Sequence, residues 1–132
     1  MTKARILIVD DHEIFRRGLR SLLETHPDWD VCGEATDGQE AVEKSKDLQP
    51  DVVVLDITMP RLNGLDATGM IRKEVPNAKV VILSQHQPGL MKQVALTAGA
   101  GAYVTKSEVS RELLAAIEGL ISLEPKAGES RR

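Results

Sequence analysis

Five side chains that could take part in catalysis or metal binding lie at or just after the ends of short apolar runs. In chain order they are Asp10, Asp11, Asp56, Ser84 and Lys106. Carboxylate oxygens suit Mg²⁺, a hard cation that keeps several waters and accepts phosphate oxygens. A lysine adds a compact positive charge for a phosphoryl oxygen, and a serine adds a hydroxyl donor. A carboxylate nucleophile, a divalent cation and a lysine together describe phosphoryl transfer onto an aspartate, here Asp56.

Each of these residues also has an ordinary structural explanation. Asp10 and Asp11 could cap the helix that follows them, and Ser84 could simply end a strand. Asp56 could start a turn, and Lys106 could be a solvated surface lysine. The chemical interpretation therefore depends on whether the predicted elements bring the five side chains together.

The stretch Asp51–Pro60, DVVVLDITMP, contains the clearest of the predicted strands. Four consecutive apolar residues favour a strand that is buried on both faces of a parallel sheet and ends at Asp56. Two similar runs and two shorter ones complete the prediction: Ile6–Val9, Val80–Leu83, Asp30–Asp37 and Ala102–Val104. The two shorter runs are expected at the edges of the sheet.

Apolar residues at helical spacing predict five helices between and after these strands. They cover His12–Glu24, Gln39–Leu48, Leu65–Val75, a segment from about Pro88 to Ala98, and Glu108–Leu123, with Ser107 as the N-cap of the last. The apolar face of the first helix is expected to contain Ile14, Phe15, Leu19, Leu22 and Leu23. The alternation predicts an α/β fold, a flavodoxin-like doubly wound five-stranded parallel sheet in the order 2-1-3-4-5.

In such a sheet the carboxyl ends of the strands meet at one edge, where open α/β sheets bind their ligands. Asp10, Asp11 and Asp56 would then lie close together, and their mutual repulsion is costly unless a cation is bound. Ser84 and Lys106 would reach the same edge. The sequence thus predicts a Mg²⁺ site beside a nucleophilic carboxylate, with Lys106 placed to stabilise a transferring phosphoryl group.

These motifs make Ala4–Leu123 resemble the receiver domain of bacterial two-component response regulators. The matching motifs are the Asp10–Asp11 pair, LDITMP around Asp56, Asn63–Gly64, Ser84, and AYVTK with Tyr103 and Lys106. The resemblance implies that Asp56 accepts a phosphoryl group from a sensor histidine kinase, assisted by Lys106 and Ser84. The metal ligands that it implies for Mg²⁺ are Asp10, Asp11, Asp56 and the backbone carbonyl of Thr58. The switch pair that it implies is Ser84 and Tyr103, and Tyr103 would turn inward on phosphorylation.

Two details narrow the resemblance. His12 follows the acid pair, and Ser107 stands where many receivers have proline. In both features the chain resembles the subfamily of receivers with a C-terminal LuxR/NarL-type helix-turn-helix. This implies control of transcription through a DNA-binding output domain that these 132 residues do not contain. A stand-alone receiver acting by protein–protein interaction is the alternative, and a homodimer formed on phosphorylation is compatible with both. We expect a receiver domain at 1–123 and a tail or linker at 124–132.

Composition agrees with a signalling switch. The net charge of −3 argues against DNA binding by this segment itself. No apolar run approaches the roughly 20 residues of a membrane span, and the chain does not start with a signal-peptide pattern. The single cysteine, Cys32, excludes an internal disulfide and fits a reducing cytoplasm. We therefore expect a cytoplasmic domain. The resemblance implies that it catalyses its own phosphorylation and dephosphorylation and turns over no outside substrate.

Three rival interpretations fit the sequence less well. A phosphatase of the haloacid-dehalogenase type needs a second aspartate two residues after the nucleophile, where this chain has Thr58. A nucleotide-binding module needs a glycine-rich loop after the first strand, but Gly99 and Gly101 precede the last strand. A receiver that is no longer regulated by phosphate would be expected to lack an acid or the lysine, and none is missing.

Overall fold

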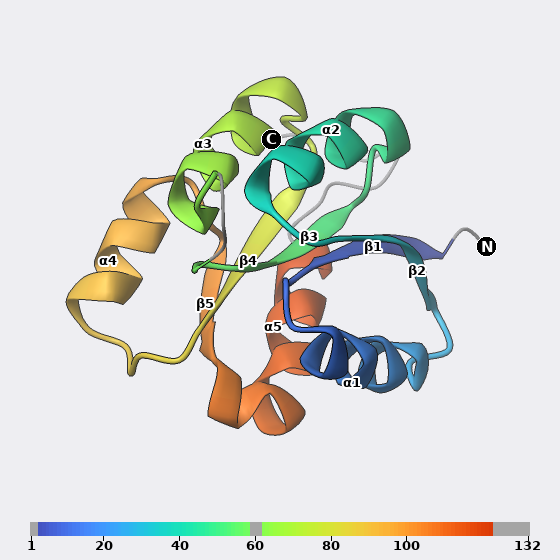
Figure 1. The fold of residues 1–132 in the computed structure, drawn as a ribbon. Helices are drawn as coiled ribbons and strands as arrows, with labels where there is room; N and C mark the ends of the chain where they lie inside the picture. The colour runs from blue at the N-terminus through green and yellow to red at the C-terminus, as the bar shows by residue number, and fades with distance from the viewer. Residues whose placement is uncertain (1–2, 59–61, 123–132) are drawn as a thin grey trace, which may run out of the picture.

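The computed structural model describes residues 3–58 and 62–122, which form a parallel sheet between two layers of helices (Figure 1). The strands are β1 (Ala4–Val9), β2 (Trp29–Ala35), β3 (Val52–Asp56), β4 (Lys79–Ser84) and β5 (Ala102–Thr105). The helices are α1 (Glu13–Glu24), α2 (Gly38–Leu48), α3 (Gly64–Glu74), α4 (Leu90–Thr97) and α5 (Val109–Ser122), with a 3₁₀ turn at Lys106–Glu108. Neighbouring strands are parallel in the order β2-β1-β3-β4-β5, so the predicted fold and strand order are confirmed.

The side chains of each strand alternate between two buried faces of the sheet. On β1, Leu7 and Val9 pack with α2, α3 and α4, whereas Ile6 and Ile8 pack with α1 and α5. All four residues are fully buried. Figure 1 shows the same division, with α1 and α5 on one side of the sheet and α2 and α3 on the other. The central strands are unbroken apolar runs because every residue faces one of the two cores.

Polar N-caps fix the starts of two helices at the carboxyl edge of the sheet. The Asp37 carboxylate accepts a hydrogen bond of 2.8 Å from the Glu40 N–H. The Asn63 side-chain oxygen accepts one of 2.9 Å from the Asp66 N–H. Helices α2 and α3 therefore begin one residue earlier than predicted, at the glycine that follows each cap.

Ile14 is the clearest error in the predicted core. Its side chain is 85% exposed, whereas Leu19 and Leu23 of the same helix are buried. Phe15, Leu19, Leu22 and Leu23 already form one stripe along α1. At about 100° per residue, Ile14 lies more than about 100° around the helix from the centre of that stripe. An apolar residue near the start of a helix was therefore assigned to the wrong face.

The second strand also differs from its prediction. The predicted strand Asp30–Asp37 is observed at Trp29–Ala35, and with seven residues it is the longest of the described strands. It lies at the edge of the sheet, as predicted. Its length follows from its pairing with the whole of β1, which includes an irregularity between Ile6 and Leu7.

Two predicted helix starts are wrong. Pro88 precedes α4, which begins at Leu90 with Gly89 as its N-cap residue. Ser107 lies inside the 3₁₀ turn that runs directly from β5 into α5, so it does not cap a helix. In both places the chain needs extra turn residues between strand and helix, and the apolar spacing carries no information about them.

Several predictions lie outside the described residues. They concern Met59 and Pro60 after the third strand, the end of the last helix at Leu123, and the tail at 124–132. Of the helices that the structure describes, none is long and apolar enough to cross a membrane.

Candidate functional site

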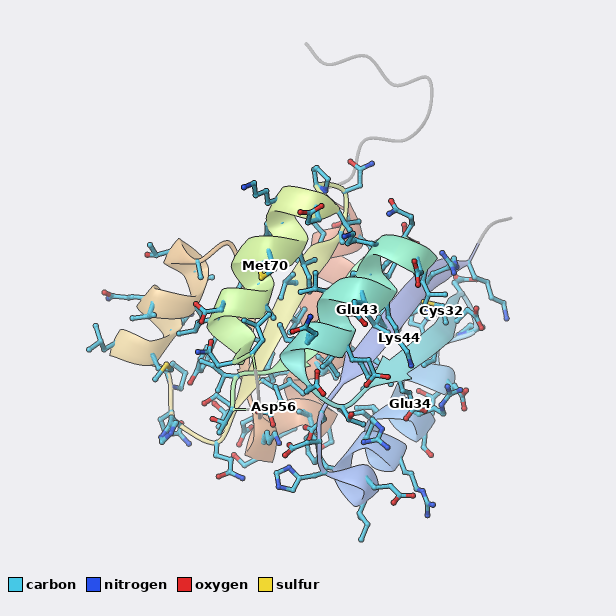
Figure 2. The ribbon with its side chains drawn as sticks, turned by 45° about the horizontal axis from the view of Figure 1, so that its top comes forward. Cys32, Glu34, Glu43, Lys44, Asp56 and Met70 are labelled. Atoms are coloured by element: carbon cyan, nitrogen blue, oxygen red, sulfur yellow. The ribbon has the colours of Figure 1, made fainter. Side chains whose placement is uncertain are left out.

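The carboxyl edge of the sheet carries a cleft of about 360 Å³. The residues that line it follow the ends of β1, β3, β4 and β5: Asp11, His12, Asp56, Thr58, Gln85, His86 and Lys106. Figure 2 shows Asp56 at the end of β3, on this edge of the sheet. The connections converge here because parallel strands all end on the same side.

Three aspartates and a histidine bring ligand atoms together at this edge. One ligand atom from each of Asp10, Asp11, His12 and Asp56 lies within 4.8 Å of the others. Asp10 is fully buried and Asp56 is 3% exposed, whereas Asp11 faces solvent. Asp10 Oδ1 accepts a hydrogen bond of 2.8 Å from the His12 N–H. Asp10 therefore shapes the turn into α1 with one oxygen and keeps Oδ2 for other partners.

Lys106 lies between two of these carboxylates. Its Nζ is 2.9 Å from Asp10 Oδ2 and 3.3 Å from Asp56 Oδ2, and its side chain is only 11% exposed. The same Nζ lies 4.5 Å from the centroid of the Phe15 ring on α1, close enough for a cation–π contact. Lys106 is thus a largely buried cation held by two buried acids, so the explanation as a solvated surface lysine is wrong.

The buried oxygen Asp10 Oδ2 receives no hydrogen bond from the residues that the structure describes. Its contact with Lys106 Nζ has the distance of an ion pair without the angle of a hydrogen bond. A buried carboxylate oxygen without a donor is costly. A divalent cation beside Asp10, Asp11 and Asp56 would satisfy this oxygen, and carboxylates are ligands that Mg²⁺ prefers. The residues present therefore fit a Mg²⁺ site.

The electrostatics of the cleft act directly on Asp56. Burial raises the pKa of Asp56, and the nearby Asp10 raises this pKa further. The Thr58 N–H, which donates to Asp56 Oδ1 at 3.1 Å, and the Lys106 ammonium act in the opposite direction. The net pKa lies above the usual aspartate value. A carboxylate perturbed by burial and a like charge, inside a cleft, is a frequent mark of a functional site.

Gly64 lets the chain fold back against the end of β3. Its N–H donates to the Ile57 carbonyl at 2.9 Å. A Cβ at this position would lie 2.5 Å from the Asp56 carbonyl oxygen and 2.6 Å from Ile57 Cα. The Asn63–Gly64 pair therefore serves the site, because the asparagine caps α3 and the glycine allows that cap to approach the Asp56 backbone.

Ser84 and Tyr103, the predicted switch pair, are both buried and do not line the cleft. The backbone of His86 connects them. Its N–H donates to Ser84 Oγ at 3.0 Å, and its carbonyl accepts a hydrogen bond of 2.8 Å from the Tyr103 hydroxyl. A movement of the Ser84 hydroxyl would therefore break a bond to the residue that holds Tyr103.

Sequence reasoning assigned no role in the cleft to His12, Gln85 or His86, yet all three line it. His12 Nδ1 lies 3.2 Å from Asp10 Oδ1 and 3.3 Å from Asp11 Oδ1. Its place directly after the acid pair was a usable signal. His86 is exposed. The loop after β4 starts at the carboxyl edge because Ser84 ends that strand, but the sequence did not indicate which of its polar side chains line the cleft.

The chain is similar in sequence and in fold to known proteins. The sequence matches the response regulator receiver domain family over residues 6–118. The transcriptional regulatory protein LiaR of Bacillus subtilis is 37% identical over 122 residues, which are 92% of this chain and 58% of LiaR. The chemotaxis protein CheY of Thermotoga maritima is 46% identical over 102 residues, 77% of this chain and 84% of CheY.

The chain thus spans little more than half the length of LiaR and of the similar regulator VraR. Among solved structures, a LuxR-family two-component response regulator from an Aurantimonas species superposes with a TM-score of 0.88 at 41% identity. That superposition covers 93% of this chain and 88% of the other. The matched residues 6–118 contain the acids and the lysine of the cleft. The chain therefore belongs to the family of response regulator receiver domains of two-component systems.

Proposed function

We propose that Asp56 is the phosphoacceptor of a Mg²⁺-dependent switch that receives its phosphoryl group from a sensor histidine kinase. The observation that carries this proposal is the cluster of Asp10, Asp56 and Lys106, in which the ammonium lies within 3.3 Å of both carboxylates. Asp56 is nearly buried yet lines the cleft, so a phosphoryl donor can approach it only from that side.

In the proposed reaction a carboxylate oxygen of Asp56 bonds to phosphorus while the bond between phosphorus and the donor breaks. The Thr58 N–H holds Asp56 Oδ1, and Lys106 lies 3.3 Å from Oδ2. Lys106 would then stabilise the charge on the phosphoryl oxygens. Bound Mg²⁺ would neutralise further charge on those oxygens. The residues proposed to hold it are Asp10, Asp11, Asp56 and the Thr58 carbonyl.

Ser84 is proposed to sense the phosphoryl group. Its hydroxyl accepts from the His86 N–H in this structure, and a turn toward the phosphoryl oxygens would break that bond. The His86 carbonyl holds the Tyr103 hydroxyl. Because Tyr103 is already buried here, we propose that the response travels through the loop after β4 into α4. Exposed apolar side chains on α4 offer a surface for a partner: Leu90, Val94 and Leu96.

The proposed output is control of transcription through a C-terminal DNA-binding domain. It is supported by the match to LiaR, a transcriptional regulator of which this chain covers 58%. The alternative is a receiver that acts by protein contacts alone, supported by the match to 84% of the chemotaxis protein CheY. A homodimer formed on phosphorylation suits either output. The single cysteine suits a reducing cytoplasm, where we propose that the domain acts.

Intact-mass measurement after incubation with acetyl phosphate and Mg²⁺ tests the phosphoacceptor. The wild type is expected to gain the mass of one phosphoryl group, and the gain should vanish in Asp56→Asn or when a chelator is present. A matched control is Asp51→Asn, which changes an exposed aspartate directly before the opposite end of the same strand and should leave the gain intact.

Two results would contradict the proposal. A mass gain that survives in Asp56→Asn would mean that another residue is the nucleophile. Absence of any gain with acetyl phosphate and with phosphoramidate, whose phosphorus–nitrogen bond resembles that of a phosphohistidine, would mean that the fold is no longer regulated by phosphate.

A further inference from the structure

A second cluster of charged side chains, outside the cleft, joins α1 to β2. Glu34 on β2 accepts hydrogen bonds from Arg16 Nε at 2.6 Å and from Arg20 Nε at 2.7 Å. The Arg16 side chain is 15% exposed and that of Glu34 is 29% exposed. Figure 2 shows Glu34 on β2 with Lys44 of α2 nearby, and Lys44 Nζ donates to the Glu34 carbonyl.

Apart from Glu34, the contacts of the two arginines differ. Arg20 Nη1 donates to Glu24 Oε2 on the same helix at 3.1 Å, whereas Arg16 reaches the site. Its Nη1 donates to the backbone carbonyl of Asp10 at 2.8 Å. On the other side of the same residue, the Asp10 N–H donates to the Ala35 carbonyl at 3.1 Å. The backbone of Asp10 is therefore held on one side by the end of β2 and on the other by a guanidinium that β2 itself fixes.

The rigidity of two planar groups makes this arrangement directional. A guanidinium presents its N–H groups in a fixed fork, so the bond from Nε to Glu34 sets where Nη1 points. The Asp10 carbonyl and the Asp11 N–H belong to one planar peptide unit. Fixing that carbonyl therefore fixes the direction in which the chain leaves Asp10 and the point from which Asp11 starts.

We propose that Arg16, oriented by Glu34, is a positioning residue of the metal site. It holds the peptide between Asp10 and Asp11 so that both carboxylates face the cation. The inference rests on the proposed function, because it takes Mg²⁺ as the ligand of these acids. It adds a role for two residues that touch neither the cation nor the phosphoryl group.

The test compares two arginines that share Glu34 but differ in their contact with Asp10. The dissociation constant for Mg²⁺ is measured by isothermal titration calorimetry on the full chain. Loss of an outer-shell partner typically weakens metal binding by 10–100-fold, so we expect Arg16→Met to raise the Kd about 10-fold and Arg20→Met to leave it within about twofold. Arg16→Lys should fall between wild type and Arg16→Met, because one ammonium cannot serve both acceptors in a fixed geometry.

Urea unfolding in the presence of a chelator separates positioning from a general structural role. Both Arg→Met variants lose an ion pair with Glu34, so both should lose stability without metal. A merely structural Arg16 would show that loss with an unchanged Kd for Mg²⁺, and this result would overturn the inference. If Arg16→Met does not fold, Arg16→Lys and Glu34→Gln carry the same test, and wild-type affinity in both would also overturn it.

The two proposals fail in different ways. A wild type that binds no Mg²⁺ would refute the proposed function together with the inference that depends on it. A wild type that binds Mg²⁺, with Arg16→Met binding it equally well, would refute the positioning role alone.

Discussion

Asp56 and Glu34, both labelled in Figure 2, are carboxylates at or near the ends of strands, and each lies beside cationic side chains. Their pKa values nevertheless move in opposite directions. Burial raises the pKa of Asp56, the repulsion of Asp10 raises it further, and Lys106 compensates only in part. Burial also raises the pKa of Glu34, but hydrogen bonds from Arg20 and Arg16 outweigh this effect and hold that pKa below its usual value.

The difference lies in the ratio of acids to bases in each cluster. Glu34 is one carboxylate with two guanidinium partners. In the cleft, two buried carboxylates share the single ammonium of Lys106, and Asp11 adds a third acid beside them. The Glu34 cluster is complete without a ligand and stabilises the fold. Among the described residues, the cleft has more carboxylates than ammonium groups, and a bound cation would relieve this surplus of negative charge. Such a surplus is typical of a site whose local energetics serve function.

The largest effect is expected from removing the ammonium that lies between two buried acids of the cleft. Lys106→Met should slow phosphorylation of the chain by acetyl phosphate about 100-fold, because it removes a preorganised positive charge from the phosphoryl oxygens. The rate is followed by intact mass at saturating Mg²⁺. The counterpart in the Glu34 cluster is Lys44→Met, which removes a lysine that contacts Glu34 and Glu40 and should leave the rate unchanged.

Equal slowing of phosphorylation in Lys106→Met and Lys44→Met would contradict the proposed difference between the two clusters. It would indicate a general loss of structure, which unfolding curves of the same two samples would reveal.

The second effect concerns stability. Glu34→Ala should lower the free energy of unfolding at neutral pH by about 2 kcal/mol, between the values for exposed and buried ion pairs, because it leaves two arginines without their acid. The pKa of Glu34 is lowered in the folded state. Its contribution is therefore present above the unfolded-state pKa and is lost as the pH falls through the folded-state pKa.

Urea unfolding of wild type and Glu34→Ala between pH 7 and pH 3 checks this prediction. The two curves should differ most near neutral pH and converge in acid. A stability difference that does not depend on pH would mean that packing of the Glu34 side chain, and not its charge, supports the contact between α1 and β2.

The contrast between the two clusters also shows what the sequence could and could not predict. The acids and the lysine of the cleft were predictable because each follows an apolar strand, and parallel strands end on one side. The Glu34 cluster was not predicted. Its members lie on a helix and on the strand that follows it, at separations of 18 and 14 residues that no periodicity connects. An arginine at a helical spacing looks like any solvated residue until the packing of α1 on the sheet is known.

The error at Ile14 has a related cause. Apolar periodicity identifies a stripe, but it does not show that every apolar residue nearby belongs to it, and Ile14, 85% exposed, lies on another face of α1. For the loop after β4, the sequence lacked a different kind of information. The start of the loop beside the site follows from the end of β4, but no pattern shows that Gln85 and His86 line the cleft.

The smallest predicted effect is the most direct test of the comparison, because the same chemical change is made in both clusters. Replacing each carboxylate by its amide, as Asp56→Asn and Glu34→Gln, should change stability in opposite directions in a chelator at neutral pH. Glu34→Gln should destabilise the fold. Asp56→Asn should stabilise it slightly, because burial and the nearby Asp10 disfavour the charged form of Asp56 in the folded state.

The sign of the Asp56 effect follows from its raised pKa in the folded state. A raised pKa means that folding favours the protonated acid, so the stability contributed by Asp56 is present below its unfolded-state pKa and is lost as the pH rises through the folded-state pKa. The gain in Asp56→Asn should therefore shrink as the pH is lowered toward the ordinary aspartate range. Saturating Mg²⁺ should reverse it, because the cation stabilises only the chain with all three carboxylates. If Asp56→Asn is instead less stable than wild type in the chelator, the charges of the cleft are already balanced, and the argument for a bound cation loses its physical basis.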